Sequence, residues 1–330
     1  TVEKDSVKYA IKLQGITKTF GSVVANHNIH LSAKKGEILA LLGENGSGKT
    51  TLMNILSGIY KPDAGEIFVN GERVVILSPE DAKHLGIGMV HQHFKLIENF
   101  TAADNIWIGT ENEKDFFLKK DRYEKIRDIS RTYGFEIDPE KKILDMSVSE
   151  KQTVEILKVL YYGAKILILD EPTAVLTPQE ITKLFGVLRV MRNQGCSIIM
   201  ITHKLNEVLE ISDRVTVLRN GESVATVNTC EADEKKLTEL MVGRPVQLEI
   251  ERPQCDFEEI LLNVHHLSVE NAEGVEAVKD ISFDLKRGEI LGVAGVAGSG
   301  QKELCEAITG LQNIKKGAIL YKKENIEGKT

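Results

Sequence analysis

A glycine-rich octapeptide near the start of the chain has the residue types needed to bind phosphate. It consists of Gly43, Glu44, Asn45, Gly46, Ser47, Gly48, Lys49 and Thr50, and it matches the pattern GxxxxGK[ST]. An apolar run (residues 37–42) precedes it and an amphipathic stretch (residues 51–57) follows, which is the strand, loop and helix order that the pattern requires. The backbone N–H groups of such a loop and the positive end of the helix can bind the β- and γ-phosphates of a nucleotide.

The side chains at the end of this loop could complete a site for a nucleotide with Mg²⁺. We expect Lys49 to bridge the phosphates and Thr50 to give its hydroxyl oxygen to Mg²⁺, which prefers one or two protein oxygens together with phosphate and water. Thr51, the next residue, belongs to the predicted nucleotide-binding set. The alternative is a glycine-rich turn that binds no ligand.

Two carboxylates follow a buried-strand pattern downstream. Four apolar residues at 166–169 lead into Asp170 and Glu171, and the carboxyl ends of parallel strands are where α/β sheets bind ligands. We expect Asp170 to hold Mg²⁺ through water, and Glu171 to orient and deprotonate the water that attacks the γ-phosphate. The alternative is that both carboxylates cap the helix that begins near Pro178.

A histidine and a glutamine follow two further strand patterns. His203 comes after the apolar run 197–201, so we expect it to enter the same crevice and contact the γ-phosphate. Gln92 follows a short strand that ends near residue 90, and it offers a neutral oxygen to Mg²⁺ and to the attacking water. Alone, His203 would be read as structural and Gln92 would carry almost no weight, and it is their order with the acidic pair that favours a role in the site.

The hydrophobic pattern predicts an α/β fold of the P-loop type. Strands are expected at 9–13, 23–31, 66–69, 166–169 and 197–201, and the last two have the continuous apolar runs of strands buried in a parallel sheet. Helices are expected at 118–133, 149–161 and 178–192. An extra helical subdomain is expected near residues 100–162.

The beginning of the chain is repeated near its end. Gly36–Leu39 recurs as Gly288–Leu291, and at the same offset four glycines of the first copy, Gly43, Gly48, Gly58 and Gly65, pair with Gly295, Gly300, Gly310 and Gly317. We predict a first domain at 1–243, a charged linker at 244–259 and the N-terminal part of a second copy at 260–330. This part should hold the strands and first helix of the repeat without the rest of its sheet, so we expect the chain to be a fragment of a longer protein.

Composition excludes several other classes of protein. The formal net charge of -7 argues against a nucleic-acid partner, because such proteins usually carry a basic face. There is no run of about 18 apolar residues of the kind that spans a bilayer. The cysteines lie far apart and read as reduced thiols of a cytosolic protein. They are Cys196, Cys230, Cys255 and Cys305.

The chain carries a phosphate loop, a glutamine, an acidic pair and a histidine in this order. In this respect it resembles the ATP-binding cassette (ABC) family of transporter ATPases, and the resemblance covers the whole chain. The resemblance implies an ABC-type nucleotide-binding domain with an antiparallel β subdomain and a helical subdomain, and ATP and Mg²⁺ as cofactors. It also implies that Phe20 stacks on adenine, with core packing as the alternative. Thr177 stands where the family usually has an aspartate, which leaves cross-talk between two cassettes open.

The resemblance assigns a second motif, the signature, to the start of a helix ahead of the acidic strand. The family usually has LSGGQ, whose backbone caps the ATP bound by the opposite cassette. The corresponding residues here are Ser147, Val148, Ser149 and Glu150. Ser149 replaces the second glycine and Glu150 the glutamine. A glutamate facing a triphosphate would be repelled, with some compensation from the helix N-terminus, so the closing role of the motif is left open.

The second phosphate loop, residues 295–302, departs further from the family pattern. Gln301 replaces the bridging lysine and Lys302 replaces the magnesium hydroxyl. Because a charge-assisted hydrogen bond to phosphate contributes roughly 1.5 to 3 kcal/mol, this loop should bind more weakly or differently. In the family's head-to-tail dimer it would face the signature at 147–151, while the loop at 43–50 would face a signature that this chain lacks. We expect one working and one degenerate site in the complete protein, with neither fully assembled in this chain.

Two fused cassettes with an altered second loop look like the ATPases of bacterial sugar and nucleoside importers. Within that group, residues 90–96 and 171–180 are closer to the nucleoside branch than to ribose or galactose importers, so a nucleoside is the first expectation for the cargo and a simple sugar the second. Rival functions are a soluble ABC ATPase that works without a permease, and a module that binds ATP without cleaving it.

The resemblance also implies partners and a location. The expected partners are transmembrane permease subunits, the second cassette of the full-length chain and, indirectly, a substrate-binding lipoprotein. The expected location is the cytoplasmic face of the bacterial plasma membrane. Residues 94–108 mix aromatic and polar side chains, and we expect them to meet the permease, with local packing as the alternative.

Overall fold

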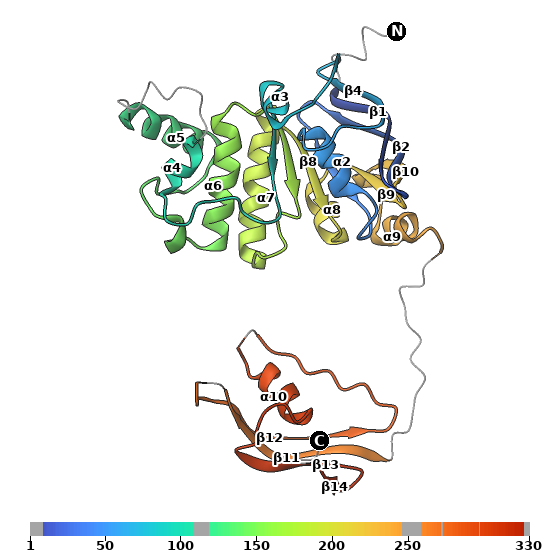
Figure 1. Cartoon of the computed structure of the whole chain (residues 1–330), viewed down its shortest axis with the longest axis vertical. Helices are drawn as coiled ribbons and strands as arrows, with labels where there is room; N and C mark the ends of the chain where they lie inside the picture. The colour runs from blue at the N-terminus through green and yellow to red at the C-terminus, as the bar shows by residue number, and fades with distance from the viewer. Residues whose placement is uncertain (1–8, 109–118, 246–258, 272, 297, 327–330) are drawn as a thin grey trace. The chain divides into compact units, whose positions relative to one another are not determined.

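A computed structural model describes residues 9–108, 119–245, 259–271, 273–296 and 298–326 (Figure 1). The chain divides into two compact units, Thr1–Leu248 and Glu249–Thr330. Most of the predicted linker, residues 246–258, lies outside the described residues. Among the described helices, none has the length and apolar character needed to cross a membrane.

A six-stranded sheet forms the centre of the first unit. Its strand order is β10–β9–β3–β8–β7–β6, in which the last five are parallel and β10 pairs antiparallel with β9. Every residue of β3, β7 and β8 is buried, as their apolar runs predict. The strands are β3 (Ile38–Leu42), β6 (Ile87–Val90), β7 (Ile166–Asp170), β8 (Ser197–Thr202), β9 (Arg214–Arg219) and β10 (Glu222–Asn228).

Helices cover both faces of this sheet. Apolar residues of α2 pack with Leu39 and Leu41 of β3 on one face, and those of α7 pack with Ile38 on the other, because successive side chains of a strand point to opposite faces. The helices of this part of the unit are α2 (Lys49–Leu56), α3 (Pro79–His84), α7 (Pro178–Asn193), α8 (Leu205–Ile211) and α9 (Glu234–Val242).

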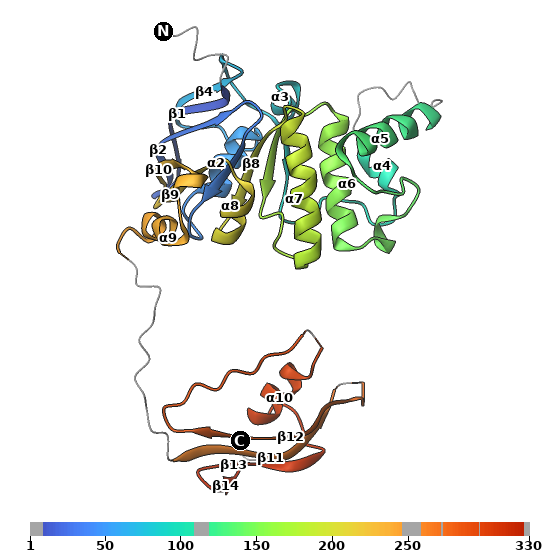
Figure 2. The ribbon, with the colours of Figure 1, turned by 180° about the vertical axis from the view of Figure 1, so that it is seen from behind.

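Two smaller subdomains lie at opposite ends of the first unit (Figures 1 and 2). One is an antiparallel sheet of order β2–β1–β4–β5, with β1 (Tyr9–Phe20), β2 (Val23–Lys34), β4 (Ala64–Val69) and β5 (Glu72–Val74). The other is helical, with α4 (Ala102–Trp107), α5 (Lys119–Tyr133) and α6 (Val148–Tyr161) around a core of their own. The predicted α/β P-loop fold with an antiparallel β subdomain and a helical subdomain is therefore confirmed.

The second unit repeats the antiparallel subdomain. Its order is β12–β11–β13–β14, with β11 (Ile260–Glu270), β12 (Glu276–Lys286), β13 (Lys316–Tyr321), β14 (Glu324–Asn325) and the helix α10 (Gln301–Ile308). The prediction that this part holds the strands and first helix of the repeat is wrong for one strand. Residues 289–296 align with β3 and its loop but form no strand among the described residues, and Ile290 is 97% exposed. In the first unit, β3 is held between β8 and β9, and the described part of the second unit has no equivalent of either.

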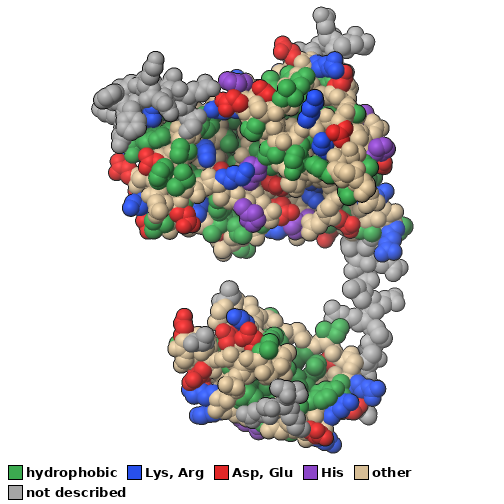
Figure 3. Space-filling view, in the orientation of Figure 1, with side chains coloured by type: hydrophobic (Ala, Val, Ile, Leu, Met, Phe, Trp, Pro, Cys, Tyr) green, Lys and Arg blue, Asp and Glu red, His purple; other side chains and the backbone are tan. Residues whose placement is uncertain are grey.

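Charges of both signs are mixed on the face of the first unit that Figure 3 shows. Over its described part, Lys and Arg side chains are interspersed with Asp and Glu.

Candidate functional site

The glycine-rich loop turns tightly between β3 and α2. Gly48 precedes α2 in the left-handed conformation with φ 94°, and α2 has no side-chain cap. A Cβ atom on Gly48 would lie 2.4 Å from both the Ala25 carbonyl oxygen and Asn26 Nδ2, and one on Gly43 would lie 2.4 Å from the Leu218 carbonyl oxygen. Glycine is therefore required at both positions, and the uncapped N–H groups of α2 suit an anion.

The structure places the other predicted loop residues around this turn. Glu44, Asn45, Gly46 and Thr50 are exposed, Thr51 is half-buried and Ser47 is buried. Thr50 lies in the first turn of α2, beside Lys49 in the sequence.

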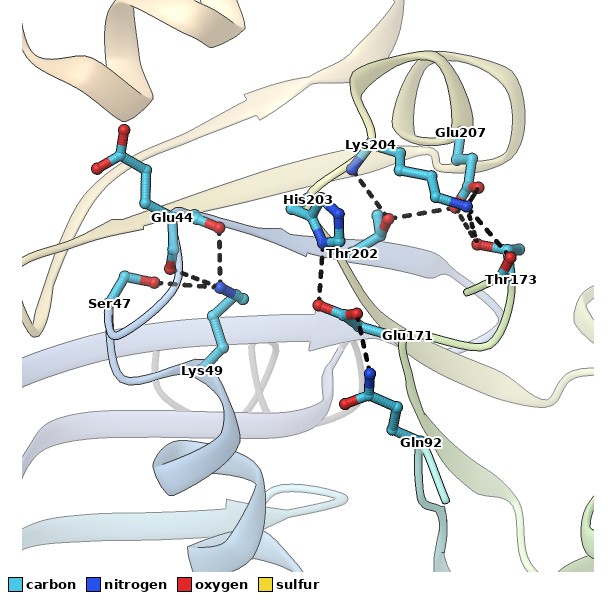
Figure 4. Close-up of polar contacts among 11 residues, drawn as sticks. Glu44, Ser47, Lys49, Gln92, Glu171, Thr173, Thr202, His203, Lys204 and Glu207 are labelled. Carbon is cyan, nitrogen blue, oxygen red and sulfur yellow. Dashed lines mark hydrogen bonds and ion pairs between the residues drawn. The ribbon is translucent and has the colours of Figure 1, made fainter. Parts of the chain in front are cut away.

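The ammonium of Lys49 lies inside the loop (Figure 4). Its Nζ atom donates to the carbonyl oxygens of Gly43 and Glu44, both at 2.8 Å, and lies 3.4 Å from Ser47 Oγ. Burial lowers the pKa of Lys49, while the nearby carboxylates of Glu171, Asp170 and Glu44 raise it. A poorly solvated cation that faces several acceptors is well suited to neutralise phosphate oxygens.

Glu171, His203 and Gln92 lie together at the carboxyl end of the sheet (Figure 4). His203 Nδ1 is 2.9 Å from Glu171 Oε1, and Gln92 Nε2 donates to Glu171 Oε2 at 3.4 Å. Glu171 has φ 46°, a left-handed conformation that is uncommon for residues other than glycine and that clusters at functional sites. The structure thus brings three of the predicted catalytic side chains into contact.

Asp170 is the last residue of β7 and is 8% exposed. Burial raises the pKa of its carboxyl group, the Glu171 carboxylate raises it further, and Lys49 opposes both. A divalent cation would stabilise the charged form, so this environment fits the predicted Mg²⁺ contact of Asp170, Thr50 and Gln92. Among the described residues, no group of three or more His, Cys, Asp or Glu side chains could hold a metal, and phosphate oxygens would have to complete the coordination.

The alternative role for the acidic pair does not hold. The helix that they could have capped, α7, is capped by Thr177, whose side chain accepts from the Glu180 N–H while the Glu180 carboxylate accepts from the Thr177 N–H at 2.8 Å. Asp170 and Glu171 are therefore not needed at its N-terminus.

The signature residues form the N-terminus of α6. Ser147 caps this helix, with Val148 exposed and Ser149 half-buried in its first turn. The Glu150 carboxylate accepts from the Ser147 N–H at 2.7 Å and from Lys141 Nζ at 2.7 Å. The hydrogen bond from Lys141 lowers the pKa of Glu150. The sequence suggested a glutamate facing phosphate with compensation only from the helix N-terminus, but the Glu150 carboxylate is paired with Lys141 and bonded to the backbone of its own helix.

A glutamine of α6 links the signature helix to the acidic pair. Gln152 is buried, and its Nε2 atom donates to the carbonyl oxygen of Pro172 at 2.7 Å. Pro172 directly follows Glu171. The backbone that follows Glu171 is therefore held by a side chain of α6, while the residue that precedes it, Asp170, is held in the sheet.

Phe20 lies at the turn between β1 and β2 and is 43% exposed, so the core-packing alternative is excluded. Its ring meets Tyr60 edge-on at 5.2 Å between centroids. The turn is held by Asp63, whose carboxylate accepts from Lys18 Nζ at 2.9 Å and from the Thr19 N–H at 2.7 Å. These bonds lower the pKa of Asp63 to about 2. An exposed aromatic ring on a fixed turn can stack on a base.

The segment predicted to meet a permease is divided between packing and exposure. Trp107 packs edge-on against Tyr123, with 5.5 Å between the ring centroids, whereas Phe100 is 42% exposed.

Of the cysteines, Cys196 is buried, and burial raises the pKa of its thiol to about 12. Cys230 and Cys305 are exposed free thiols, and Cys255 lies outside the described residues.

The altered second loop has no internal ammonium among its described residues. Gln301 Nε2 donates to the Val293 carbonyl oxygen at 3.3 Å. The Lys302 side chain is 79% exposed and lies 3.8 Å from the Glu306 carboxylate. The arrangement that Lys49 has in the first loop is therefore not repeated.

Sequence reasoning missed two buried residues that touch the site. Asn26 is fully buried, its Nδ2 atom donates to the Gly48 carbonyl oxygen at 3.1 Å, and its Oδ1 atom has no hydrogen-bond partner. A signal for it was available, since the internal repeat aligns Asn26 with an apolar residue, Val278. The second missed residue is Glu207 of α8, which contacts Thr173 and Thr202. No motif singles out Glu207.

Comparison with known proteins agrees with this geometry. A model of the family described as "ABC transporter" matches residues 26–174 and 278–330. The nucleoside import ATP-binding protein NupA of Lactococcus lactis is 48% identical over 96% of this chain and 63% of its own length. The guanosine import ATP-binding protein NupO of Bacillus subtilis is 48% identical over 98% of this chain and 64% of its own length. The ribose import ATP-binding protein RbsA 3 of Rubrobacter xylanophilus is 41% identical over 94% of this chain and 62% of its own length.

The chain thus spans less than two thirds of the length of these curated relatives. Among solved structures, an ATP-binding cassette of an ABC transporter in its ADP conformation superposes with a TM-score of 0.60 at 24% identity, covering 71% of this chain and 95% of that one. At this identity the likeness shows the fold.

Proposed function

This chain belongs to the ABC transporter family, and on that premise we propose that it is the part of an importer that binds and hydrolyses ATP. The observation that carries the proposal is the contact of Glu171 with both His203 and Gln92 beside the loop that holds Lys49. A phosphate chain bound by the loop would reach the same edge of the sheet, because the carboxyl ends of β3, β7 and β8 lie side by side.

The chain's own residues divide the chemistry. Lys49 and the N–H groups of α2 bind the β- and γ-phosphates, and the exposed ring of Phe20 stacks on the adenine. Thr50 and Gln92 would provide protein oxygens for Mg²⁺ and Asp170 would hold it through water, and the cation would neutralise charge on the phosphates. Glu171 accepts a proton from the attacking water, and His203 orients Glu171 and contacts the γ-phosphate.

We propose a nucleoside as the cargo of the complete importer. Support comes from the relatives NupA and NupO, whose names specify nucleoside and guanosine import and whose identity of 48% exceeds the 41% of the ribose relative. A simple sugar is the second candidate, favoured by that ribose relative.

The proposed assembly has two cassettes in one longer chain. The second unit repeats the order of the antiparallel subdomain and has its own match to the family, so we propose that it is the start of the second cassette, with domains at 1–243 and 260–330 joined by a linker at 244–259. The proposed partners are transmembrane permease subunits, contacted in part by residues 94–108, and indirectly a substrate-binding lipoprotein. The proposed location is the cytoplasmic face of a bacterial plasma membrane.

ATP turnover by the full-length protein with its permease tests the enzymatic proposal. The Glu171→Gln variant should keep its affinity for ATP and lose most turnover, because general-base assistance is typically worth about 10² to 10⁴ in rate. Turnover within about twofold of the parent would remove Glu171 from this role. Parent turnover that does not depend on the permease would favour a soluble ABC ATPase.

Transport by the intact complex in proteoliposomes tests the cargo. Labelled guanosine, adenosine and uridine are compared with ribose and galactose under identical conditions, and the Glu171→Gln complex serves as the control for ATP-dependent uptake. Uptake of nucleosides supports the first candidate. Uptake of ribose or galactose alone would replace it with the second.

A further inference from the structure

A buried carboxylate outside the predicted site joins the two loops that carry Glu171 and His203. Glu207 lies in the first turn of α8 and is 7% exposed. Figure 4 shows its side chain directed toward the ends of β7 and β8. A charged group at such low exposure is costly unless its oxygens are satisfied, so its partners indicate what it does.

A threonine hydroxyl near each of the two reacting groups donates a hydrogen bond to Glu207. Thr173 Oγ1 donates to Glu207 Oε2 at 2.7 Å, and Thr202 Oγ1 donates to the same oxygen at 3.2 Å. Thr173 lies two residues after Glu171, and Thr202 directly precedes His203. Both threonines are 2% exposed. A single carboxylate oxygen therefore ties the two chain segments that present the reacting groups.

Lys204 completes the arrangement. Its Nζ atom lies 3.0 Å from Glu207 Oε1 and donates to the Thr173 carbonyl oxygen at 3.1 Å. Its backbone N–H donates to Thr202 Oγ1 at 3.1 Å. The second oxygen of Glu207 is thus paired with a cation that itself spans the two loops.

These hydrogen bonds to Glu207 begin where the pairing of β7 with β8 ends. The pairing of β7 with β8 stops at Asp170 and Ile201, and the last backbone bond runs from the Glu171 N–H to the Ile201 carbonyl oxygen at 3.0 Å. Glu171 adopts φ 46° immediately beyond the ladder, a conformation that costs about 1 to 3 kcal/mol and persists only when surrounding contacts impose it.

We propose that Glu207 is a positioning residue for ATP hydrolysis, which fixes Glu171 and His203 relative to each other through Thr173 and Thr202. The inference rests on the proposed function, since it concerns the same reaction. Glu207 does not touch the reacting atoms. Its loss should therefore lower the rate of the chemical step and leave the binding of ATP in the loop at 43–50 unchanged.

The test compares Glu207→Gln with Glu210→Gln in the full-length protein assembled with its permease. Glu210 is a matched control because it lies on the same helix, α8, with its side chain 53% exposed and paired with Arg189 at 3.5 Å. In Glu207→Gln the amide nitrogen would face the Lys204 ammonium. The ion pair with Lys204 would then be replaced by two hydrogen-bond donors that face each other. We expect kcat to fall at least tenfold, KM to stay within twofold, and the control to match the parent.

A second arm separates positioning from a general structural role. In the Glu171→Gln background, adding Glu207→Gln should lower residual single turnover by less than twofold, because the group that Glu207 positions is already absent. A further tenfold loss there would overturn the proposal, as would a parallel rise in KM in the single variant. If Glu207→Gln does not fold, Thr173→Val replaces it, with an expected loss in kcat of about threefold or more.

The outcomes also distinguish the two proposals. A parent complex without ATP turnover overturns the proposed function and this inference with it. An active parent with Glu207→Gln and Thr173→Val both within twofold of its kcat overturns only the inference.

Discussion

Asn26→Val tests whether the amide beneath the phosphate loop shapes the loop or merely stabilises the fold. The change removes the hydrogen bond from Nδ2 to the Gly48 carbonyl oxygen at 3.1 Å. That carbonyl keeps a second partner, the Leu52 N–H at 3.0 Å, so no buried acceptor is left unpaired. The change also removes Oδ1, which is buried without a hydrogen-bond partner, and valine is the residue at the aligned position 278.

The two effects on stability therefore oppose each other. One lost hydrogen bond costs about 1 kcal/mol, while relief of a buried unpaired oxygen gains about 1 to 3 kcal/mol. We expect the free energy of unfolding to stay the same or to rise by up to about 2 kcal/mol. ATP affinity should fall, because Gly48 at φ 94° sets the direction of the N–H groups that follow it. The expected loss is about fivefold in Kd, which corresponds to about 1 kcal/mol.

Calorimetric titration with a non-hydrolysable ATP analogue gives the affinity, and urea denaturation without nucleotide gives the stability. Asn54→Val is not a suitable control, because Asn54 lies on α2 itself. Asn105→Val in the helical subdomain is suitable, because Asn105 is also buried and its hydrogen-bond partners, Ile97 and Thr101, are not part of the phosphate loop. It should lose stability with unchanged affinity. Unchanged affinity in Asn26→Val, or a loss of stability and affinity together, would refute the reasoning.

Three further substitutions probe the site. Lys49→Ala should weaken ATP binding at least tenfold by calorimetry, because it removes the ammonium inside the loop, and equal affinity would contradict its assignment to phosphate. Asp170→Asn should raise the melting temperature of the nucleotide-free protein by a few degrees and abolish the tightening of nucleotide binding by Mg²⁺. The pKa of Asp170 is raised in the fold, so its charge destabilises the folded protein above that pKa. The gain in melting temperature should therefore fade as the pH falls through the raised pKa. Glu150→Ala should lower the melting temperature at pH 7, because the lowered pKa of Glu150 means that its charge stabilises the fold above the unfolded value of 4.5. The difference in melting temperature should narrow as the pH falls below 4.5, and a difference independent of pH would exclude the Lys141 pair as its cause.

Much of the fold could be predicted because its signals are local. The apolar runs at 166–169 and 197–201 could be read as buried parallel strands, and the loop between β3 and α2 is specified by glycines and one lysine. The end of β1 could not be predicted from the local pattern. It continues to Phe20 beyond the predicted residue 13, since pairing with β2 carries it past an irregular register.

The missed parts of the site depend on contacts between residues distant in the sequence. Asn26 and Gly48 are 22 residues apart, and Thr173 and Glu207 are 34 apart. Nothing in the type of Glu207 or Asn26 shows which loop the fold will place beside it. The same holds for the pairing of Glu150, since the role of Lys141 as its counter-ion depends on how the chain ahead of α6 is folded. The roles in catalysis that the motifs suggest for Gln92, Glu171 and His203 stay predictions.

The segment after Gly288, which joins no sheet in the described part of the chain, bears on how the protein should be handled. Ile290, Val293 and Val296 are 97%, 52% and 79% exposed, and backbone outside a sheet with exposed apolar side chains can pair with strands of other molecules. Concentrated samples of this chain should consequently self-associate through that stretch. Crystallisation or spectroscopy of the nucleotide site would be better served by a shorter polypeptide that stops at Gly243.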